Sequence, residues 1–126
     1  RSSDLVTLTL HQQMMVDQLL AAFAKEPFAP PNMPEALRML GGDTELLESL
    51  VESGQLVRLG DGILFRQSDF DAMLAQVQAF AKQSGSITLA QTRDLLQTSR
   101  KYAQALLEEL DARRITRREG DLRVLR

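Results

Sequence analysis

The sequence predicts a mainly α-helical fold with small β wings, arranged as two tandem winged-helix (winged helix-turn-helix) domains. One observation is an internal repeat with an offset of 60 residues: LLESL at 46–50 returns as LLEEL at 106–110, Gly60-Asp61 as Gly120-Asp121, and LFR at 64–66 as VLR at 124–126. A second is that each half reads as three helical patterns followed by two short strands around a Gly-Asp turn. We expect the domains to be residues 1–67 and 68–126.

The first half opens with a long helix over LHQQMMVDQLLAAFAKE, in which apolar residues return at near-helical spacing. The residues expected to face the core are Leu10, Met14, Val16, Leu19, Leu20 and Phe23. The prolines of FAPPNMP then predict an extended segment. Two shorter helices follow, EALRML up to Gly41-Gly42 and DTELLESLVESG up to Gly54, before LVRL and ILFR form a hairpin around Gly60-Asp61-Gly62.

The second half begins with a helix for which Ser68 is the predicted N-cap, and this helix ends near Gly85. Its expected buried residues are Phe70, Met73 or Leu74, Val77, and Phe80 or Ala81. Thr88 to Gln91 has the form of a capping box, which predicts a short helix that ends near Leu96. The last helix is capped by Thr98 or Ser99 and precedes a hairpin over ITRREGDLRVLR; its buried stripe is Ala103, Leu106, Leu107 and Leu110.

Charge is distributed unevenly along the chain, although the formal net charge of the 126 residues is only -2. Residues 1–81 hold five Lys and Arg against eleven Asp and Glu, and residues 82–126 hold ten against six, so that the two parts carry -6 and +4. This asymmetry indicates an anionic partner for the C-terminal part, or else electrostatic attraction between the two parts of the chain.

The residue types leave little for catalysis or metal binding. The absence of cysteine excludes disulfides, thiol catalysis and thiolate metal sites. His11, the single histidine, has no second ligand at metal-binding spacing, so we interpret it as a surface residue. No phosphate-binding glycine motif and no membrane-length apolar run occurs, and the start, RSSDLVTLTL, is not a signal peptide. We expect a piece of a longer protein that is neither an enzyme nor a membrane protein and that holds no cofactor.

Two cations open the last helix at a place where acidic residues favour stability. Arg100 and Lys101 follow the cap Ser99, off the buried stripe and beside the free N–H groups of the first turn. A phosphate is a suitable ligand for such a terminus. The alternative is that Asp94 or Glu119 neutralises the two cations.

The final hairpin is rich in arginine, which suits bidentate phosphate recognition and stacking on bases. Because side chains alternate along a strand, Arg117 and Arg118 are expected on opposite faces. The alternative to RNA binding is that the arginines only keep the exposed hairpin solvated. The four arginines are Arg117, Arg118, Arg123 and Arg126.

Three further residues have a structural interpretation that we prefer. Tyr102, the only tyrosine, either stacks on a base or packs under its helix, and the second is favoured. Arg113 and Arg114 complement the C-terminus of the last helix, and Glu109 to Arg113 is a favourable i,i+4 pair.

These residues carry a resemblance to a known family. The stretch RDLLQTSRKYAQALLEELDARRITRREGDLRVLR is similar to the end of the bacterial selenocysteine-specific elongation factor SelB, and FAPP at 28–31 fits as well. The most specific parts are TSRKYA (98–103), LLEELD (106–111), TRREGD (116–121) and RVLR (123–126). One departure is Arg114, where the family has a glycine in the turn before the final hairpin, which puts the geometry of that turn in question.

The resemblance implies a fold, a partner and a location. SelB joins an EF-Tu-like GTPase to four winged helices, so this chain corresponds to the last two. It implies that the last winged helix binds the SECIS hairpin of selenoprotein mRNA beside a UGA codon, by gripping its phosphate backbone and reading extruded loop bases, at the ribosome and in the cytoplasm. GTP and selenocysteinyl-tRNA would belong to the preceding domains, and the chain itself would be monomeric.

We therefore predict an RNA-binding surface in the second domain, with the first domain orienting it, because the first helix-wing pair offers only Arg58 and Arg66 as cations. Two other functions use the same fold: a DNA-binding transcriptional regulator, normally a symmetric dimer, and a protein-interaction module. The predicted RNA-binding residues are Ser99, Arg100, Lys101, Tyr102, Arg117, Arg118 and Arg123, with Arg93 and Lys82 at the rim.

Overall fold

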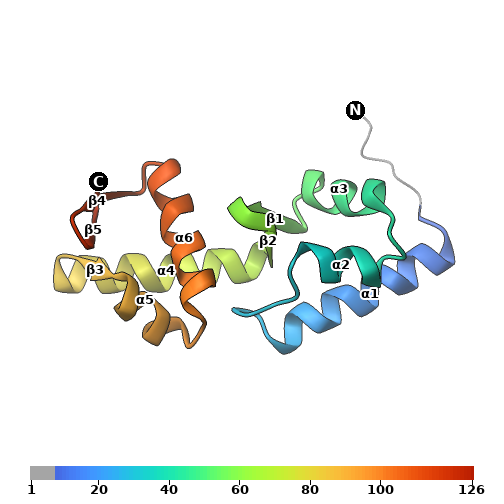
Figure 1. The fold of residues 1–126 in the computed structure, drawn as a ribbon, viewed down its shortest axis with the longest axis horizontal. Coiled ribbons are helices and arrows are strands. Elements are labelled where there is room, and N and C mark those ends of the chain that lie inside the picture. Colours follow the sequence, from blue (N-terminus) through green and yellow to red (C-terminus); the bar gives the residue numbers. More distant parts are fainter. Residues whose placement is uncertain (1–7) are drawn as a thin grey trace.

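The computed structural model describes residues 8–126 and shows two helical units, each followed by a small hairpin (Figure 1). No helix in this part of the chain is both long and apolar enough to cross a membrane. The first unit contains α1 (Leu10–Lys25), α2 (Met33–Met39), α3 (Thr44–Glu52), β1 (Leu56–Leu59), η2 (Gly60–Gly62) and β2 (Ile63–Arg66). The second contains α4 (Gln67–Ser84), β3 (Ile87–Thr88), α5 (Leu89–Leu96), α6 (Arg100–Ala112), β4 (Thr116–Glu119) and β5 (Leu122–Leu125).

The core of the first unit lies between α1, α2 and α3. Val16, Leu19 and Phe23 of α1 are buried, as the apolar spacing predicts, and Leu20 is partly buried. The prediction is wrong for Leu10 and Met14, which are 80% and 52% exposed. At about 100° per residue, both lie on the face of α1 opposite to the core.

Proline placement separates α1 from α2, with one difference from the prediction. The extended segment ends at Asn32, whose side chain accepts a hydrogen bond from the Glu35 N–H and caps α2. Pro34 lies inside the first turn of α2. A missing N–H costs nothing there, because that donor has no partner within the helix.

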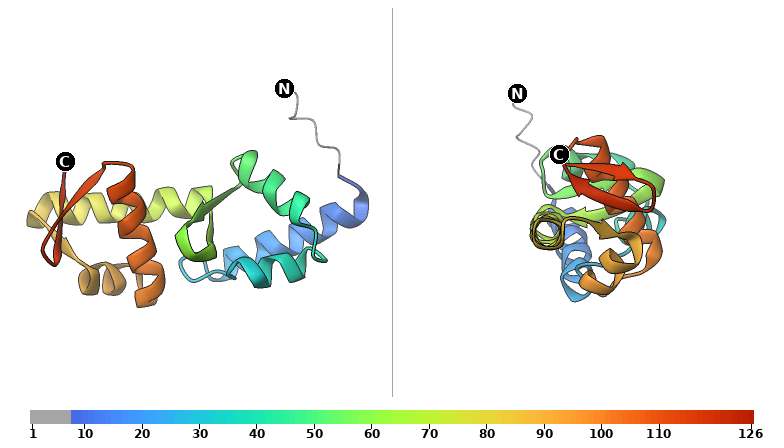
Figure 2. Two further views of the ribbon diagram at one scale, coloured as in Figure 1. Left: turned by 45° about the horizontal axis from the view of Figure 1, so that its top comes forward. Right: turned by 90° about the vertical axis from the view of Figure 1, so that its left-hand side faces the viewer.

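The hairpin β1–β2 lies between the two units and belongs to both cores (Figures 1 and 2). Leu56 and Leu64 pack into the first core. Side chains alternate along a strand. The opposite face of the hairpin therefore contributes to the second core, where α4 and α6 pack against it, through Val57, Leu59, Ile63 and Phe65.

The second unit is built on α4, which begins at Gln67 rather than after Ser68. Arg66 is the N-cap residue, and no side chain caps the helix. Its guanidinium instead donates from Nε and Nη2 to the two oxygens of Asp69, at 2.6 and 2.9 Å, and thereby fixes the first turn. Burial of Phe70, Met73, Val77 and Ala81 is confirmed, and Leu74 and Phe80 are partly buried.

The remaining helices have the predicted caps. Thr88 and Gln91 form the capping box of α5. Ser99, rather than Thr98, caps α6, and the predicted stripe of α6 is fully buried. In the sheet of order β3-β5-β4, Arg118 pairs with Arg123, whereas in the first unit Arg58 pairs with Leu64. The connection between the strands is one residue shorter in the second hairpin than in the first. Therefore β4 follows its equivalent β1 by 60 residues, whereas β5 follows its equivalent β2 by 59.

Candidate nucleic-acid interface

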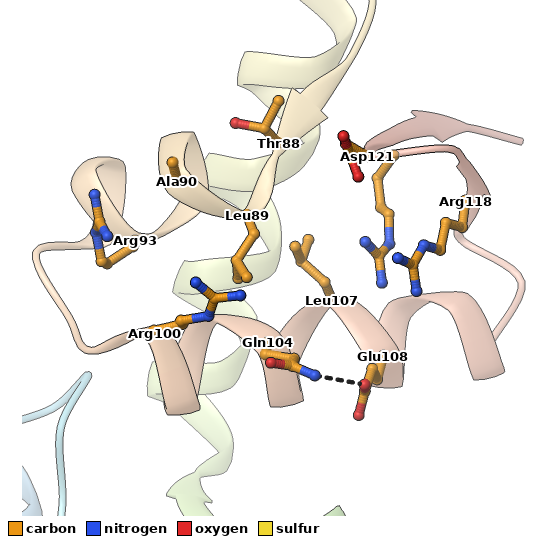
Figure 3. Close-up of a pocket in the computed structure, with 11 residues that line it drawn as sticks. Thr88, Leu89, Ala90, Arg93, Arg100, Gln104, Leu107, Glu108, Arg118 and Asp121 are labelled. Carbon is orange, nitrogen blue, oxygen red and sulfur yellow. Dashed lines mark hydrogen bonds between the residues drawn. The ribbon is translucent and has the colours of Figure 1, made fainter.

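A groove with a volume of about 370 Å³ lies where α5, α6 and the hairpin β4–β5 meet. We call it the arginine groove, because four of its lining residues are arginines. Figure 3 shows Arg93, Arg100 and Arg118, which come from these three elements, around the apolar floor of Leu89 and Leu107. The full lining is Thr88, Leu89, Ala90, Arg93, Arg100, Gln104, Leu107, Glu108, Arg118, Asp121 and Arg123.

The N-terminus of α6 supplies the exposed cations. The Ser99 hydroxyl is occupied as the cap, accepting from the Tyr102 N–H at 3.4 Å. Arg100 and Lys101 are exposed, and within residues 8–126 neither takes part in a salt bridge. Asp94, one of the two carboxylates considered as partners of these cations, pairs with Arg93 instead.

The hairpin arginines differ in their contacts. Arg117 pairs with Glu119, the other alternative partner, on the same strand. Arg118 donates from Nε to the carbonyl oxygen of Gly120 at 3.0 Å and stays exposed in the groove. The geometry therefore brings Arg118 toward Arg100 and turns Arg117 to the other face of the hairpin.

Arg123 is buried, unlike the other cations predicted to bind RNA. Its side chain is only 8% exposed, and its Nε donates to the Oδ2 of Asp111 at 3.1 Å. The reason is its place on β5, where it faces α6 from the middle of the sheet. Arg123 still lines the arginine groove, but from its inner wall.

Tyr102 is packed under its helix and is not available as a stacking platform. Its hydroxyl donates to the Pro30 carbonyl oxygen at 2.7 Å, and its ring meets Phe65 edge-on at a centroid distance of 5.8 Å. The Thr98 hydroxyl makes a similar bond, 2.5 Å long, to the Phe28 carbonyl oxygen. These two bonds join the start of α6 to the loop between α1 and α2.

Other predicted residues lie outside the groove. Lys82 is exposed on the last turn of α4 and does not line the groove. Arg113 bonds to Glu109 at 2.8 Å, as predicted, and its guanidinium also lies 4.5 Å from the ring centre of Phe70. Arg114 is exposed at the end of α6.

Sequence reasoning missed several polar residues of the groove. Gln104 lies one turn after Arg100 on the same face of α6, and its side chain donates to Glu108 at 3.2 Å (Figure 3). The i,i+4 spacing from Arg100 was a signal that identifies Gln104. Asp121 comes from the hairpin turn, and no helical or strand period predicts its position.

The first unit has a groove of the opposite charge. Its groove lies between α1 and α3 and is lined by Asp43, Glu45, Glu48 and Glu52, among other residues. The two wing arginines are already paired, Arg58 with Glu48 and Arg66 with Asp69. The charge asymmetry of the sequence therefore appears as one cationic and one acidic surface.

Fold and groove together define a tandem winged-helix protein with a cationic groove in its second unit. Residues 78–125 match the family described as "Elongation factor SelB, winged helix". The selenocysteine-specific elongation factor of Desulfomicrobium baculatum is 29% identical over 82 residues, which make up 65% of this chain and 13% of that protein. The second unit is thus similar to the winged helix of SelB, as the resemblance predicts, and the chain spans only a small part of that curated protein's length.

Two solved structures have the same fold. The mRNA-binding domain of elongation factor SelB from E. coli, in complex with SECIS RNA, superposes with a TM-score of 0.74 and 22% identity, over 94% of this chain and 99% of that one. The crystal structure of a bacterial selenocysteine-specific elongation factor, EF-Sec, gives a TM-score of 0.74 and 23% identity, over the whole of this chain and 20% of that one. The predicted tandem winged-helix fold is confirmed.

Proposed function

We propose that this chain binds the SECIS hairpin of selenoprotein mRNA through the arginine groove. The observation that carries the proposal is the groove itself, which Arg118 lines from the hairpin, near Glu108, and Arg100 lines at the start of α6 (Figure 3). Free N–H groups and a positive helix end complement phosphate there. The structure of the E. coli SelB mRNA-binding domain in complex with SECIS RNA, which has the same fold, supports this choice of ligand.

The groove suits an RNA hairpin better than duplex DNA. A DNA-binding winged helix inserts a helix into the wide major groove of B-form DNA, whereas the major groove of A-form RNA is too deep and narrow for side chains. A compact set of arginines at the corner between a helix and a wing instead fits a hairpin backbone with a few unstacked bases. Tyr102 is held by Pro30 and Phe65, which leaves the arginines as the groups that bind.

The two domains, residues 1–67 and 68–126, have different roles in this proposal. The second binds RNA through Arg100, Arg118 and Arg123, with Lys101, Arg117, Arg93 and Lys82 around them. The first holds the start of α6 through the hydroxyl bonds to Phe28 and Pro30. Its acidic surface repels a phosphate backbone, so its contribution is orientation rather than contact.

In the proposed cellular setting this chain acts as part of a longer elongation factor in the cytoplasm. GTP hydrolysis and selenocysteinyl-tRNA binding would take place in other domains of that factor. Binding of the hairpin would hold the factor at the ribosome beside the UGA codon. The chain itself would act as a monomer without a cofactor.

A titration of the chain against three nucleic acids at two salt concentrations tests the proposal. The ligands are a SECIS-type RNA hairpin, the same stem with a scrambled loop, and duplex DNA. We expect tight binding to the intact hairpin alone. Preference for duplex DNA would favour a transcriptional regulator. Equal, weak binding to all three would reduce the groove to a nonspecific cationic surface, and no salt-dependent binding would favour a protein-interaction module.

A further inference from the structure

The second unit contains a buried polar network at a place where the first unit is apolar. Asp111, at the end of α6, accepts a hydrogen bond from the Thr116 hydroxyl at 2.6 Å through Oδ1 and one from Arg123 Nε at 3.1 Å through Oδ2. Thr116 is fully buried and the Arg123 side chain is 8% exposed. The network therefore joins α6 to both strands of the final hairpin.

The repeat shows that the fold does not require this network. The positions of Asp111 and Thr116 correspond to Val51 and Leu56, at an offset of 60 residues. Arg123 corresponds to Leu64, because Leu64 pairs with Arg58 as Arg123 pairs with Arg118. Leu56 and Leu64 are buried in the first core, with Val51 packed against it.

Stability does not account for the exchange of apolar residues for charged ones. Removing an ion pair from water costs more than its attraction often returns, and well-packed apolar replacements are commonly as stable or more so. A charge pair that persists at such a position, with the Arg123 side chain 8% and the Asp111 side chain 27% exposed, calls for another explanation, which the groove supplies.

The network sets the direction of two groove arginines. Arg123 uses Nε for Asp111, and within residues 8–126 its guanidinium makes no other hydrogen bond, so its outer nitrogens remain available at the inner wall of the groove. Arg118 is the cross-strand neighbour of Arg123 on the same face of the hairpin. The position of Arg118 relative to Arg100 on α6 therefore depends on how the hairpin is held to the end of that helix.

We propose that Asp111 is a positioning residue for nucleic-acid binding: it aims Arg123, and through the hairpin Arg118, at acceptor groups of an RNA in the arginine groove. This inference rests on the proposed function. By its charge alone, Asp111 would weaken the binding of an anionic RNA. The proposed positioning role instead increases the affinity for RNA.

Charge gives the test its direction. Asp111→Asn removes a negative charge near the groove, so electrostatics alone would tighten RNA binding. Positioning predicts the reverse, a loss of about tenfold, as expected when one arginine contact is misplaced. Glu109→Gln is the matched control, because it removes a negative charge from the same helix, outside the groove, and we expect it to bind at least as tightly as the wild type.

A double-mutant cycle shows whether Asp111 acts through Arg123. In an Arg123→Leu background, Asp111→Asn should change affinity less than about twofold, because the ion pair through which Asp111 positions Arg123 and the hairpin is already lost. A full tenfold loss in that background would contradict the inference. So would wild-type or tighter binding by Asp111→Asn alone, and in that case the proposed function would still stand.

A further variant covers the outcome in which Asp111→Asn does not fold. Asp111→Val, Thr116→Leu and Arg123→Leu together restore the apolar residues of the first unit. We expect this protein to melt no lower than the wild type and to bind the hairpin no better than Arg123→Leu. Wild-type affinity in the triple variant would overturn the inference, whereas failure of the wild type itself to bind RNA would overturn the proposed function and the inference with it.

Discussion

Arg114 and Gly54 occupy equivalent positions at the ends of α6 and α3, and both adopt the left-handed conformation, with φ of 61° and 86°. Their N–H groups donate to the carbonyl oxygens of Asp111 and Val51 at 3.0 and 3.1 Å. The next residues, Ile115 and Gln55, close the same pair of turns. The departure from glycine at Arg114 therefore leaves the geometry of the turn unchanged, and its cost is conformational strain.

Replacing Arg114 by glycine should stabilise the protein. Glycine adopts a positive φ without the clash of a Cβ atom, so we expect Arg114→Gly to raise the free energy of unfolding by about 0.5 to 1 kcal/mol. Urea denaturation followed by circular dichroism measures the change. Arg114→Ala separates strain from charge, because it removes the guanidinium, retains the Cβ atom and should give no such gain.

The reciprocal change should have the opposite sign. Within residues 8–126, no heavy atom beyond Gly54 and its two chain neighbours lies within 4 Å of a Cβ built on Gly54, so Gly54→Ala introduces strain without a steric collision. We expect a loss of about 1 kcal/mol by the same measurement. An unchanged free energy of unfolding would show that strain at this turn has no thermodynamic weight.

The bond from Tyr102 to Pro30 should contribute measurably to stability. Tyr102→Phe keeps the ring beside Phe65 but leaves the partly buried carbonyl of Pro30 without its donor, which costs about 1 kcal/mol. Thermal unfolding followed by circular dichroism tests this. Thr98→Val removes the neighbouring bond to Phe28 and should have a similar effect, whereas two wild-type melting curves would contradict the role given to both hydroxyls.

Alkaline pH should weaken the same contact. Burial of the ring, and next the charge of Glu35, raises the pKa of Tyr102 above its ordinary value of 10.0. Because the folded state holds the phenolic proton more tightly than the unfolded state, this stabilisation is complete below the unfolded pKa and is lost as pH rises through the folded pKa. Ultraviolet titration of this only tyrosine should follow the ionisation, and Tyr102→Phe should remove that component of the pH dependence.

The exposed cations of α6 should determine the salt dependence of RNA binding. Arg100→Ala and Lys101→Ala should each lower the slope of log affinity against log salt by about 0.7 to 0.9, for one lost phosphate contact. Filter binding over a range of salt concentrations gives the slope. Arg58→Ala is the control, because Arg58 is paired with Glu48 in the other unit and should leave the slope unchanged; equal slopes for all three variants would rule out the assignment.

The sequence predicted those parts of the fold that depend on local periodicity and capping. The stripe of α6 and the capping box at Thr88 are confirmed because hydrogen bonds and apolar spacing within a few residues determine them. The prediction was wrong for Leu10 and Met14 because they lie on the side of α1 that faces away from the core, where an apolar side chain has no partner. The sequence did not predict that β5 is displaced by one residue from the 60-residue repeat, because identical residues at an offset of 60 do not show how the strands pair.

The sequence predicted the positive charge of the candidate site but not which of its residues are buried. Arg100 and Arg118 line the same groove because α6 and the hairpin β4–β5 form adjacent walls of it (Figure 3). Arg123 was predicted as one of the cations that bind RNA, and only its tertiary pairing with Asp111, twelve residues earlier, buries its side chain. Tyr102 packs against Phe65 and Pro30, which precede it by tens of residues, so no local pattern settles between packing and stacking.

The two-faced hairpin β1–β2 limits how this chain can be shortened. A recombinant piece that starts at Ser68 would lose Val57, Leu59, Ile63 and Phe65, and with them one wall of the core around Phe70 and Leu106. The apolar surface so uncovered favours aggregation over folding. The smallest piece that keeps the core of the second unit intact therefore begins before Leu56, inside what the repeat marks as the other domain.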